Sequence, residues 1–158
     1  MEKKIAIFPG SFDPFTKGHA HIVEKALEIF DEVIIFVASN PNKKRMFDVR
    51  AIGSIIEEKY HNLEMEGRIH VCTQPNSLVI DVAKMYGAKF ITKGIRNATD
   101  ADYELSQAEA NKWLGGLQTV LIPCDKEYSY ISSTLVRSLL SVTGENSEMA
   151  REKANELM

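Results

Sequence analysis

The sequence predicts an α/β protein built on one doubly wound, Rossmann-like sheet of five parallel strands, with helices on both faces. Short apolar segments rich in β-branched residues alternate with helical segments along the chain, and this pattern indicates right-handed βαβ crossovers. No Pro- or Ser-rich linker and no internal repeat interrupts the alternation. A length of 158 residues is typical of one domain, so we expect residues 1–158 to form a single domain.

Five segments have the composition of buried strands. They are residues 4–8 (KIAIF), 32–38 (EVIIFVA), 69–73 (IHVCT), 88–92 (AKFIT) and 119–122 (TVLI). The second is continuously apolar, as expected for a strand that is covered on both faces. We expect Pro9-Gly10 to end the first strand and Pro123 to close the fifth.

Six segments are expected to be helical. They are residues 19–30, 49–60, 78–86, 99–114, 132–140 and a charged C-terminal helix at 147–157. In the first, the apolar residues from Ile22 to Phe30 recur at helical spacing. Ser77 is placed to cap the third helix and Gly87 to stop it, while Gly115-Gly116 ends the fourth.

Composition and charge exclude several classes of protein. The 19 Lys and Arg are outnumbered by 22 Asp and Glu, so no general basic excess is available to hold a nucleic acid. No apolar run approaches the roughly 20 residues of a membrane span, and Met1–Lys4 leads into a strand rather than into a signal peptide. Cys72 and Cys124 show no metal-ligand spacing and are expected to be reduced. We therefore expect a cytoplasmic protein without nucleic-acid or membrane partners.

Ligands of doubly wound sheets bind at the carboxyl ends of the strands. The loops that follow the five strands are residues 9–18, 39–47, 74–77, 93–98 and 123–133. None contains the G-x-G-x-x-G or the G-x-x-x-x-G-K-[ST] pattern, which argues against a dinucleotide oxidoreductase and a P-loop NTPase.

The first of these loops carries a candidate anion site. Gly18 would let a ligand approach the backbone, and His19 falls in the first turn of a helix, where free N–H groups favour an anion. A donor imidazole at that place suits a phosphate or an oxyanion; a capping loop with a surface histidine remains the alternative. His21 lies roughly 200° further round the helix, so we expect it to be solvated or to pack elsewhere.

The last loop holds a second candidate cluster, residues 128–137 (YSYISSTLVR). Three consecutive hydroxyls, Ser132 to Thr134, stand at a helix start with Arg137 on the same face, and such a set could seat a triphosphate. A simple N-cap run is the alternative. Basic residues at 43–45 and at Lys93 and Arg96 follow the second and fourth strands. Together these cations predict a ligand with several phosphates.

These residues carry a resemblance to a known family. Thr16-x-Gly18-His19 resembles the [TH]-x-G-H signature of nucleotidyltransferases, and residues 131–137 resemble their I-S-S-T-x-x-R signature. The likeness to bacterial phosphopantetheine adenylyltransferases runs from about Ile5 to Arg137 and includes residues 8–14, 42–44, 94–96, 102–104 and Asn111.

The resemblance implies transfer of an adenylyl group from ATP to 4′-phosphopantetheine, with Mg²⁺ as cofactor and with a homohexameric assembly. His19 would stabilise the transition state at the α-phosphate, and Lys43 would hold the acceptor phosphate; no residue is assigned as a metal ligand. The implied ATP contacts are Ser11, Phe12, His19, Gly94, Ile95, Arg96, Glu104, Tyr128, Ser129, Tyr130, Ile131, Ser132, Ser133, Thr134 and Arg137. The implied acceptor contacts are Ser11, Lys43, Leu78, Val79, Lys93 and Asn111.

The residue inventory agrees with this chemistry. A phosphate monoester has a second pKa of about 6 and is already anionic near neutrality, so the reaction needs no general base. The main obstacle is the repulsion between two anions, which cations and positioning overcome.

One departure concerns Lys93, where the family usually has Arg; Lys keeps the charge but loses the bidentate fork. The alternatives are another adenylyl- or cytidylyltransferase of the same superfamily, such as a nicotinate-mononucleotide adenylyltransferase, and a non-catalytic nucleotide-binding regulator.

Overall fold

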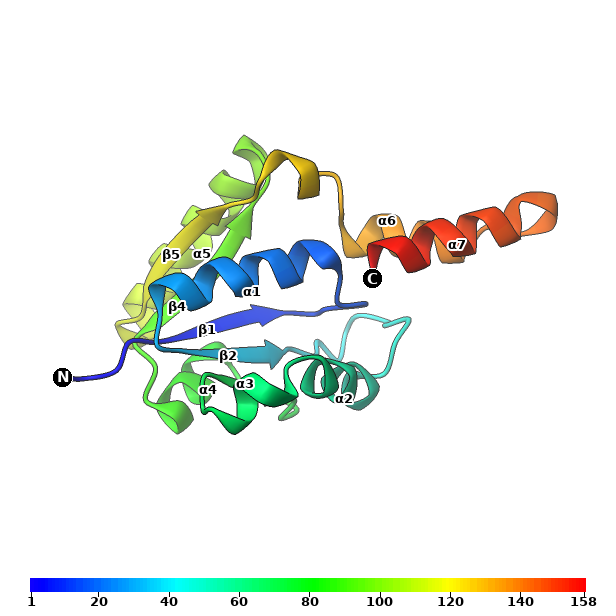
Figure 1. The fold of residues 1–158 in the computed structure, drawn as a ribbon. Helices are drawn as coiled ribbons and strands as arrows, with labels where there is room; N and C mark the ends of the chain where they lie inside the picture. The colour runs from blue at the N-terminus through cyan, green and yellow to red at the C-terminus, as the bar shows by residue number, and fades with distance from the viewer.

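The computed structural model describes residues 1–158 and confirms the predicted fold class (Figure 1). Its sheet has five parallel strands in the order β3-β2-β1-β4-β5. The strands are β1 (Ile5–Gly10), β2 (Glu32–Val37), β3 (Ile69–Cys72), β4 (Phe90–Ile95) and β5 (Gln118–Pro123). The order reverses between β1 and β4, which is where such a sheet opens a ligand site.

Seven α-helices and two 3₁₀ turns connect and follow the strands. They are α1 (Lys17–Ile29), α2 (Val49–Lys59), α3 (His61–Met65), α4 (Val79–Tyr86), α5 (Ala98–Gly115), η1 (Lys126–Tyr128), α6 (Ser133–Leu140), η2 (Gly144–Asn146) and α7 (Ser147–Leu157). The short helix α3 is absent from the sequence prediction, because its five residues are too few to show a periodicity.

Two apolar cores lie on the two faces of the sheet, because successive side chains of a strand point to opposite faces. Ala6 and Phe8 of β1 join the core that α1 and α2 cover, whereas Ile7 joins the core that α4 covers. All of β2 from Val33 to Val37 is buried, as its continuous apolar run predicts. Figure 1 shows α1 in front of the sheet and α5 behind it.

Two strand ends differ from the prediction and shape the site. β1 continues through Pro9 to Gly10, where both residues pair with β2. β4 continues through Lys93 and Gly94 to Ile95, all paired with β5, so residues 93–95 belong to the strand and not to the loop. β1 and β4 pair with each other only at their beginnings, up to Ile7. The two strands therefore part toward their carboxyl ends.

Three helix starts also differ. α1 begins at Lys17, with Thr16 as its N-cap, and α5 begins at Ala98, capped by the side chain of Asn97. Ser77 does not cap α4: its hydroxyl donates to the Pro75 carbonyl at 3.4 Å, and the carboxylate of Asp81 accepts from the Leu78 N–H instead.

The helix stops agree with the prediction. Gly87 and Gly116 end α4 and α5 with φ of 70° and 68°, in the left-handed region that glycine enters without a Cβ penalty.

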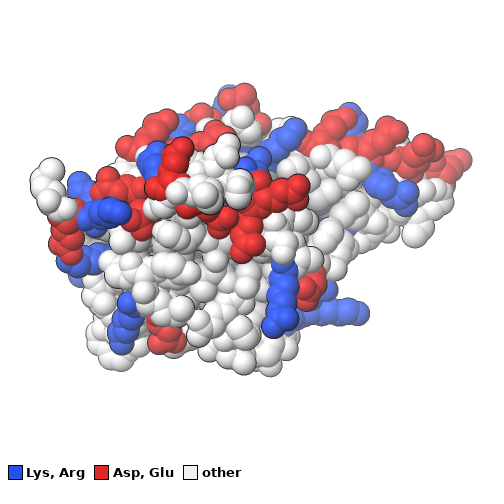
Figure 2. Space-filling view, turned by 60° about the horizontal axis from the view of Figure 1, so that its bottom comes forward, with Lys and Arg blue, Asp and Glu red and all other residues white.

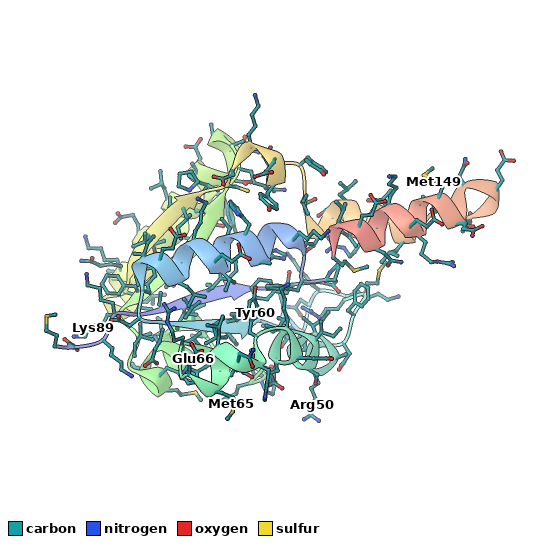
Figure 3. All side chains as sticks on the ribbon, viewed as in Figure 1. Arg50, Tyr60, Met65, Glu66, Lys89 and Met149 are labelled. Atoms are coloured by element: carbon teal, nitrogen blue, oxygen red, sulfur yellow. The ribbon has the colours of Figure 1, made fainter.

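The arm formed by α6 and α7 projects from the body of the molecule, and Val136, Ala150 and Ala154 are buried where the two helices pack. On the face shown in Figure 2, acidic and basic side chains are interspersed over the body, and acidic ones predominate on the arm. Met149 of α7 and Met65 of α3 project into solvent, whereas Tyr60 lies inside (Figure 3). No helix is long and apolar enough to cross a bilayer.

Asp13 fastens the loop after β1 to the loop after β2. Its buried carboxylate accepts from the Met46 N–H at 3.0 Å and from the Phe47 N–H at 2.8 Å. An unsatisfied buried donor costs about 1–3 kcal/mol. This bridge sets the path of the chain next to Ser11 and Phe12.

We expect Asp13→Ala to lower the free energy of unfolding by about 2–4 kcal/mol, because two N–H groups lose their acceptor at once. Urea denaturation measures this change. Asp48→Ala is the matched control: Asp48 also accepts two backbone N–H bonds but is an exposed N-cap, so its removal should cost about 1 kcal/mol. Equal losses in the two variants would contradict the bridging role of Asp13.

Candidate active site

Two adjoining cavities open where β1 and β4 part. The first has a volume of about 330 Å³ and the second about 220 Å³. Five residues line both cavities: Pro9, Gly10, Ser11, Lys93 and Glu104. The two spaces thus meet at the carboxyl ends of β1 and β4.

The first cavity is lined by the two predicted signatures and by the end of β4. Beyond the shared residues, its wall consists of Phe8, Phe12, Gly18, His19, Ile22, Gly94, Arg96, Asp100, Cys124, Tyr128, Ile131, Ser132, Ser133 and Thr134. The second cavity lies between the sheet, α4 and α5. Its remaining lining residues are Ala38, Val79, Ile91, Tyr103, Gln107, Ala108, Asn111 and Thr119.

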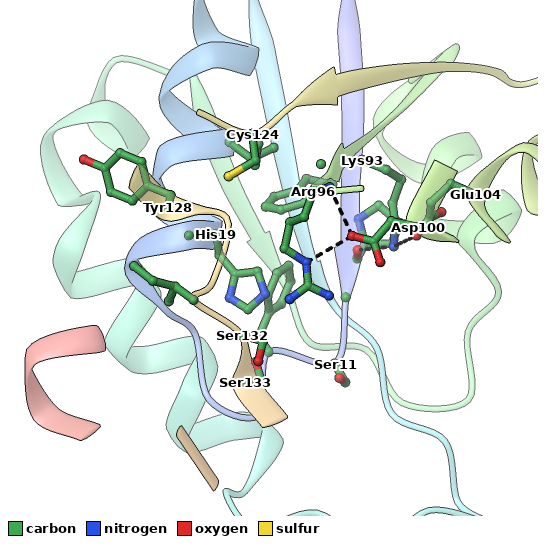
Figure 4. Close-up of a pocket in the computed structure, with 18 of the residues that line it drawn as sticks. Ser11, His19, Lys93, Arg96, Asp100, Glu104, Cys124, Tyr128, Ser132 and Ser133 are labelled. Atoms are coloured by element: carbon green, nitrogen blue, oxygen red, sulfur yellow. Dashed lines mark hydrogen bonds and ion pairs between the residues drawn. The ribbon is translucent and has the colours of Figure 1, made fainter. Parts of the chain in front are cut away.

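His19 is held in one orientation by the cap of α1. Its Nδ1 accepts from the Thr16 N–H at 2.9 Å, and its own N–H donates to the Thr16 hydroxyl at 3.3 Å. Because Nδ1 is an acceptor, the proton of the neutral ring lies on Nε2. His19 is therefore not the surface histidine of the alternative interpretation: its second nitrogen is a free donor in the first cavity (Figure 4).

The surroundings of His19 keep its ring neutral. Phe12 packs edge-on against it with ring centroids 4.9 Å apart, and Phe15 lies at 5.4 Å. Burial among these rings lowers the pKa of His19 to about 3, and the charges of Lys93 and Arg96 act in the same direction. His19 can therefore donate one hydrogen bond at neutral pH without carrying a charge.

The two signatures are joined by direct contacts. The Ser133 hydroxyl donates to the Pro14 carbonyl at 2.7 Å. At Gly18 a Cβ would stand 3.3 Å from the carbonyl oxygen of Ile131, so the close approach predicted for a ligand is made by the chain itself. The starts of α1 and α6 thus face the same cavity.

Arg137 differs from its predicted place in the triphosphate seat. One guanidinium nitrogen donates to the Asp13 carbonyl at 2.7 Å and the other to the Thr134 hydroxyl at 3.2 Å, and the residue does not line the cavity. Ser132 is the N-cap of α6 and accepts from the Leu135 N–H. The N-cap alternative is therefore right for Ser132, while Ser132, Ser133 and Thr134 all reach the cavity wall.

Each cation of the site has an acidic partner. The Nε of Arg96 lies 3.0 Å from the Asp100 carboxylate, which also accepts from the Arg96 N–H. Burial alone would raise the pKa of Asp100, but the hydrogen bonds from Arg96 and its charge lower that pKa below its usual value. The Nζ of Lys93 lies 3.4 Å from Glu104 at the junction of the two cavities. Figure 4 shows both pairs beside His19 and Ser11.

Most predicted contacts lie in the cavities. Those of the predicted ATP set that line the first are Ser11, Phe12, His19, Gly94, Arg96, Glu104, Tyr128, Ile131, Ser132, Ser133 and Thr134. Those of the predicted acceptor set that line the second are Ser11, Val79, Lys93 and Asn111. Packing also favours glycine at position 94, because a Cβ there would lie 2.7 Å from the side chain of Ile22 on α1.

Six predicted residues lie outside both cavities: Lys43, Leu78, Ile95, Ser129, Tyr130 and Arg137. Lys43 stands on an exposed turn after β2 and lines neither cavity. Leu78 and Tyr130 are largely exposed. The sequence locates the segment in which each of these residues lies. It does not determine where the side chain points, because that depends on how the chain folds back.

Glu104 and Asn111 of α5 were expected from the sequence, whereas their neighbours Tyr103, Gln107 and Ala108 in the second cavity were not. Tyr103, Gln107 and Asn111 recur every four residues, as do Glu104 and Ala108, so they form one stripe on the helix. That spacing is the signal that could have found them. Asp100, four residues after Arg96, could have been found in the same way. Cys124 has no such signal.

The site offers no cage for a resident metal ion. No group of three or more His, Cys, Asp or Glu side chains gathers anywhere in the chain. The two carboxylates of the first cavity, Asp100 and Glu104, already pair with Arg96 and Lys93. A divalent cation would have to rely on phosphate oxygens and water, which is how Mg²⁺ is often bound.

Known proteins resemble this chain in sequence. The sequence profile of the cytidylyltransferase-like family matches residues 7–139. A phosphopantetheine adenylyltransferase of Latilactobacillus sakei is 41% identical over 146 residues, covering 92% of this chain and 87% of that protein. One of Cytophaga hutchinsonii is 43% identical over 146 residues, covering 90% and 93%.

Solved structures resemble the fold. A nicotinic acid mononucleotide adenylyltransferase of Plasmodium falciparum superposes with a TM-score of 0.65 at 16% identity, covering 99% of this chain and 90% of that one. A putative nicotinate-nucleotide adenylyltransferase of Vibrio parahaemolyticus gives 0.58 at 19% identity, covering 97% and 94%. At these identities the likeness concerns the fold alone.

We expect the His19 imidazole to stay in its neutral Nε2–H form from pH 5 to pH 8, because burial lowers its pKa to about 3. A histidine in the unfolded chain has a pKa of about 6.5. Below about pH 6.5 the unfolded state therefore takes up a proton that folded His19 does not, and the free energy of unfolding decreases. Long-range ¹H–¹⁵N NMR of the imidazoles reports both tautomer and titration, and His19→Gln identifies the signal. A midpoint between pH 5 and pH 8, or a proton on Nδ1, would contradict the assignment.

Proposed function

Because the chain belongs to the cytidylyltransferase-like family and, within it, to the phosphopantetheine adenylyltransferases, we infer that it transfers the adenylyl group of ATP to 4′-phosphopantetheine. The products are dephospho-coenzyme A and pyrophosphate. The protein is therefore a nucleotidyltransferase of coenzyme A biosynthesis.

The two adjoining cavities are the structural observation that supports this function. A transferase of this kind needs two substrates side by side with their phosphates in contact. We propose that the first cavity binds ATP and the second binds the pantetheine arm. The shared residues Ser11, Lys93 and Glu104 then mark the place where the two phosphates meet.

The transfer itself needs little covalent help from the protein. An oxygen of the acceptor phosphate attacks the α-phosphorus of ATP, and the bond from that phosphorus to the bridging oxygen breaks. Pyrophosphate leaves with the bonding electrons. The acceptor phosphate has a second pKa of about 6, so it arrives without a proton to remove. Catalysis then rests on alignment and on neutralising charge.

We propose that His19 supplies the donor at the reacting phosphate. Its Nε2–H is free, because Nδ1 is occupied by the Thr16 N–H. A neutral donor of fixed orientation stabilises the extra negative charge that the α-phosphate develops. Being buried among Phe12 and Phe15, the ring needs no reorientation when that charge appears.

Cations flank this donor. Arg96 is held by Asp100 through its Nε, which leaves its two terminal nitrogens free for phosphate oxygens. Lys93 forms an ion pair with Glu104. An incoming acceptor phosphate must therefore replace this carboxylate as the partner of the Lys93 ammonium. We propose that Lys43 joins them from its exposed turn only when substrate is bound.

We propose that Mg²⁺ enters together with the ATP phosphates, since the chain offers no ligand cluster of its own. When bound, the ion would neutralise phosphate charge. We also propose a cytoplasmic homohexamer, as the family resemblance implies. The apolar side chains exposed on α5, Trp113 and Leu114 among them, provide surface that assembly would cover, and light scattering measures the mass.

The decisive experiment offers ATP with a panel of acceptors and follows pyrophosphate release. We expect release with 4′-phosphopantetheine and much less with nicotinate mononucleotide or with nicotinamide mononucleotide. CTP in place of ATP tests for cytidylyl transfer. ATP binding without release for any acceptor would indicate a nucleotide-binding regulator instead.

His19→Ala is the control for the same panel. Losing one donor of this kind typically lowers kcat by ~10²–10³-fold, so the folded variant should release pyrophosphate at least ~10²-fold more slowly. Turnover within a few-fold of the parent chain would remove His19 from the mechanism.

We expect Lys93→Ala to raise KM for 4′-phosphopantetheine ~10-fold or more, the loss that follows when a charge-assisted hydrogen bond worth roughly 1.5 kcal/mol disappears. KM for ATP should change much less, and Lys93→Arg should retain activity because it keeps the charge and adds a fork. Steady-state kinetics with each substrate varied in turn separates the two constants.

Lys89→Ala is the matched control for Lys93. Lys89 precedes the same strand at its other end and pairs with Glu2 in solvent, so neither KM should change. An effect of Lys93→Ala on ATP alone, or on neither substrate, would show that the acceptor phosphate binds elsewhere.

A further inference from the structure

His21 is a buried titratable side chain that the mechanism does not use. It is 8% exposed and lies on α1, two residues after His19, on a different side of the helix. Its imidazole stacks on the ring of Tyr128, with centroids 4.2 Å apart and an interplanar angle of 14°. The predicted packing histidine is thus packed against one particular residue of the first cavity wall.

The imidazole of His21 is also tied to the turn that leads to Tyr128. Its Nε2 accepts from the Asp125 N–H at 3.3 Å and lies 3.3 Å from the Asp125 carboxylate. When Nε2 carries no proton it accepts from the N–H, and when it carries one it can donate to the carboxylate. Lys25, one helical turn further along α1, reaches the same carboxylate at 3.5 Å.

These contacts act on the part of the chain that closes the first cavity. Asp125 is the N-cap of η1, and Tyr128 is the last residue of that turn. The Tyr128 carbonyl then accepts from the N–H of Ile131, where the second signature begins. One helix therefore places His19 inside the cavity and braces the cavity wall through His21.

We propose that His21 is a positioning residue for nucleotide binding, acting through Tyr128. The inference rests on the proposed function, in which the first cavity binds ATP. The flat ring of His21 fixes the plane of the Tyr128 ring by stacking on it. Its Nε2 acceptor fixes the position of Asp125, where η1 begins.

The test measures binding of the non-reactive analogue α,β-methylene-ATP by calorimetry. We expect His21→Ala to weaken binding ~5- to 10-fold, the order expected when a stacking partner and a hydrogen-bond acceptor are lost together. His21→Phe keeps the stack and loses the acceptor, so it should fall between the parent and His21→Ala. KM for 4′-phosphopantetheine should stay within about twofold.

A double-mutant cycle with Tyr128→Ala separates positioning from general packing. If His21 acts through Tyr128, the double variant should bind no more weakly than Tyr128→Ala alone, because the losses are not additive. His70→Ala is the matched control: His70 also faces a tyrosine, Tyr86, at 5.6 Å, but lines neither cavity, and its loss should leave binding unchanged.

Additive losses, equal weakening of both substrates or unchanged analogue binding would each overturn the proposal. If His21→Ala does not fold, His21→Phe decides alone: it must bind the analogue more weakly than the parent chain at the same melting temperature. A parent chain that binds no analogue would count against the proposed function itself and not against the role of His21.

Discussion

The first cavity depends on one contact, in which the Ile131–Arg137 segment packs against the loop after β1. Ser133 and Arg137 both donate to backbone carbonyls of that loop at 2.7 Å, and Gly18 leaves room for the Ile131 carbonyl. The bonds satisfy oxygens that an irregular loop would otherwise leave unpaired. They also turn the starts of α1 and α6 toward one space, where their free N–H groups favour an anion.

Charge in that space is balanced rather than simply positive. Arg96 and Lys93 each have a carboxylate partner, and their charges help to keep His19 neutral. Burial is the main reason that the histidine is a neutral donor and not a third cation, and the two cations act in the same direction. Because Glu104 pairs with Lys93 between the cavities, an anion that entered there would have to compete with a carboxylate for the ammonium.

The fold class, the order of the elements and the two signatures at strand-to-helix junctions can all be predicted from the sequence. These are local properties: an apolar run such as residues 33–37, a helix stop at Gly87, or a histidine that follows a glycine in a first turn. Periodicity and capping act over a few neighbouring residues, so the chain alone reveals them. The individual contact residues were implied by the family resemblance and not by these local patterns.

The contacts between side chains that are distant in the sequence depend on how the whole chain folds. Arg137 donates a hydrogen bond to the Asp13 carbonyl, 124 positions away in the chain. His21 stacks on Tyr128 instead of facing solvent. The extension of β4 through Lys93 depends on pairing with β5, and the orientation of the α5 stripe depends on how that helix lies against the sheet. Each of these depends on strand register and on the packing of segments far apart in sequence, and no local pattern records such contacts.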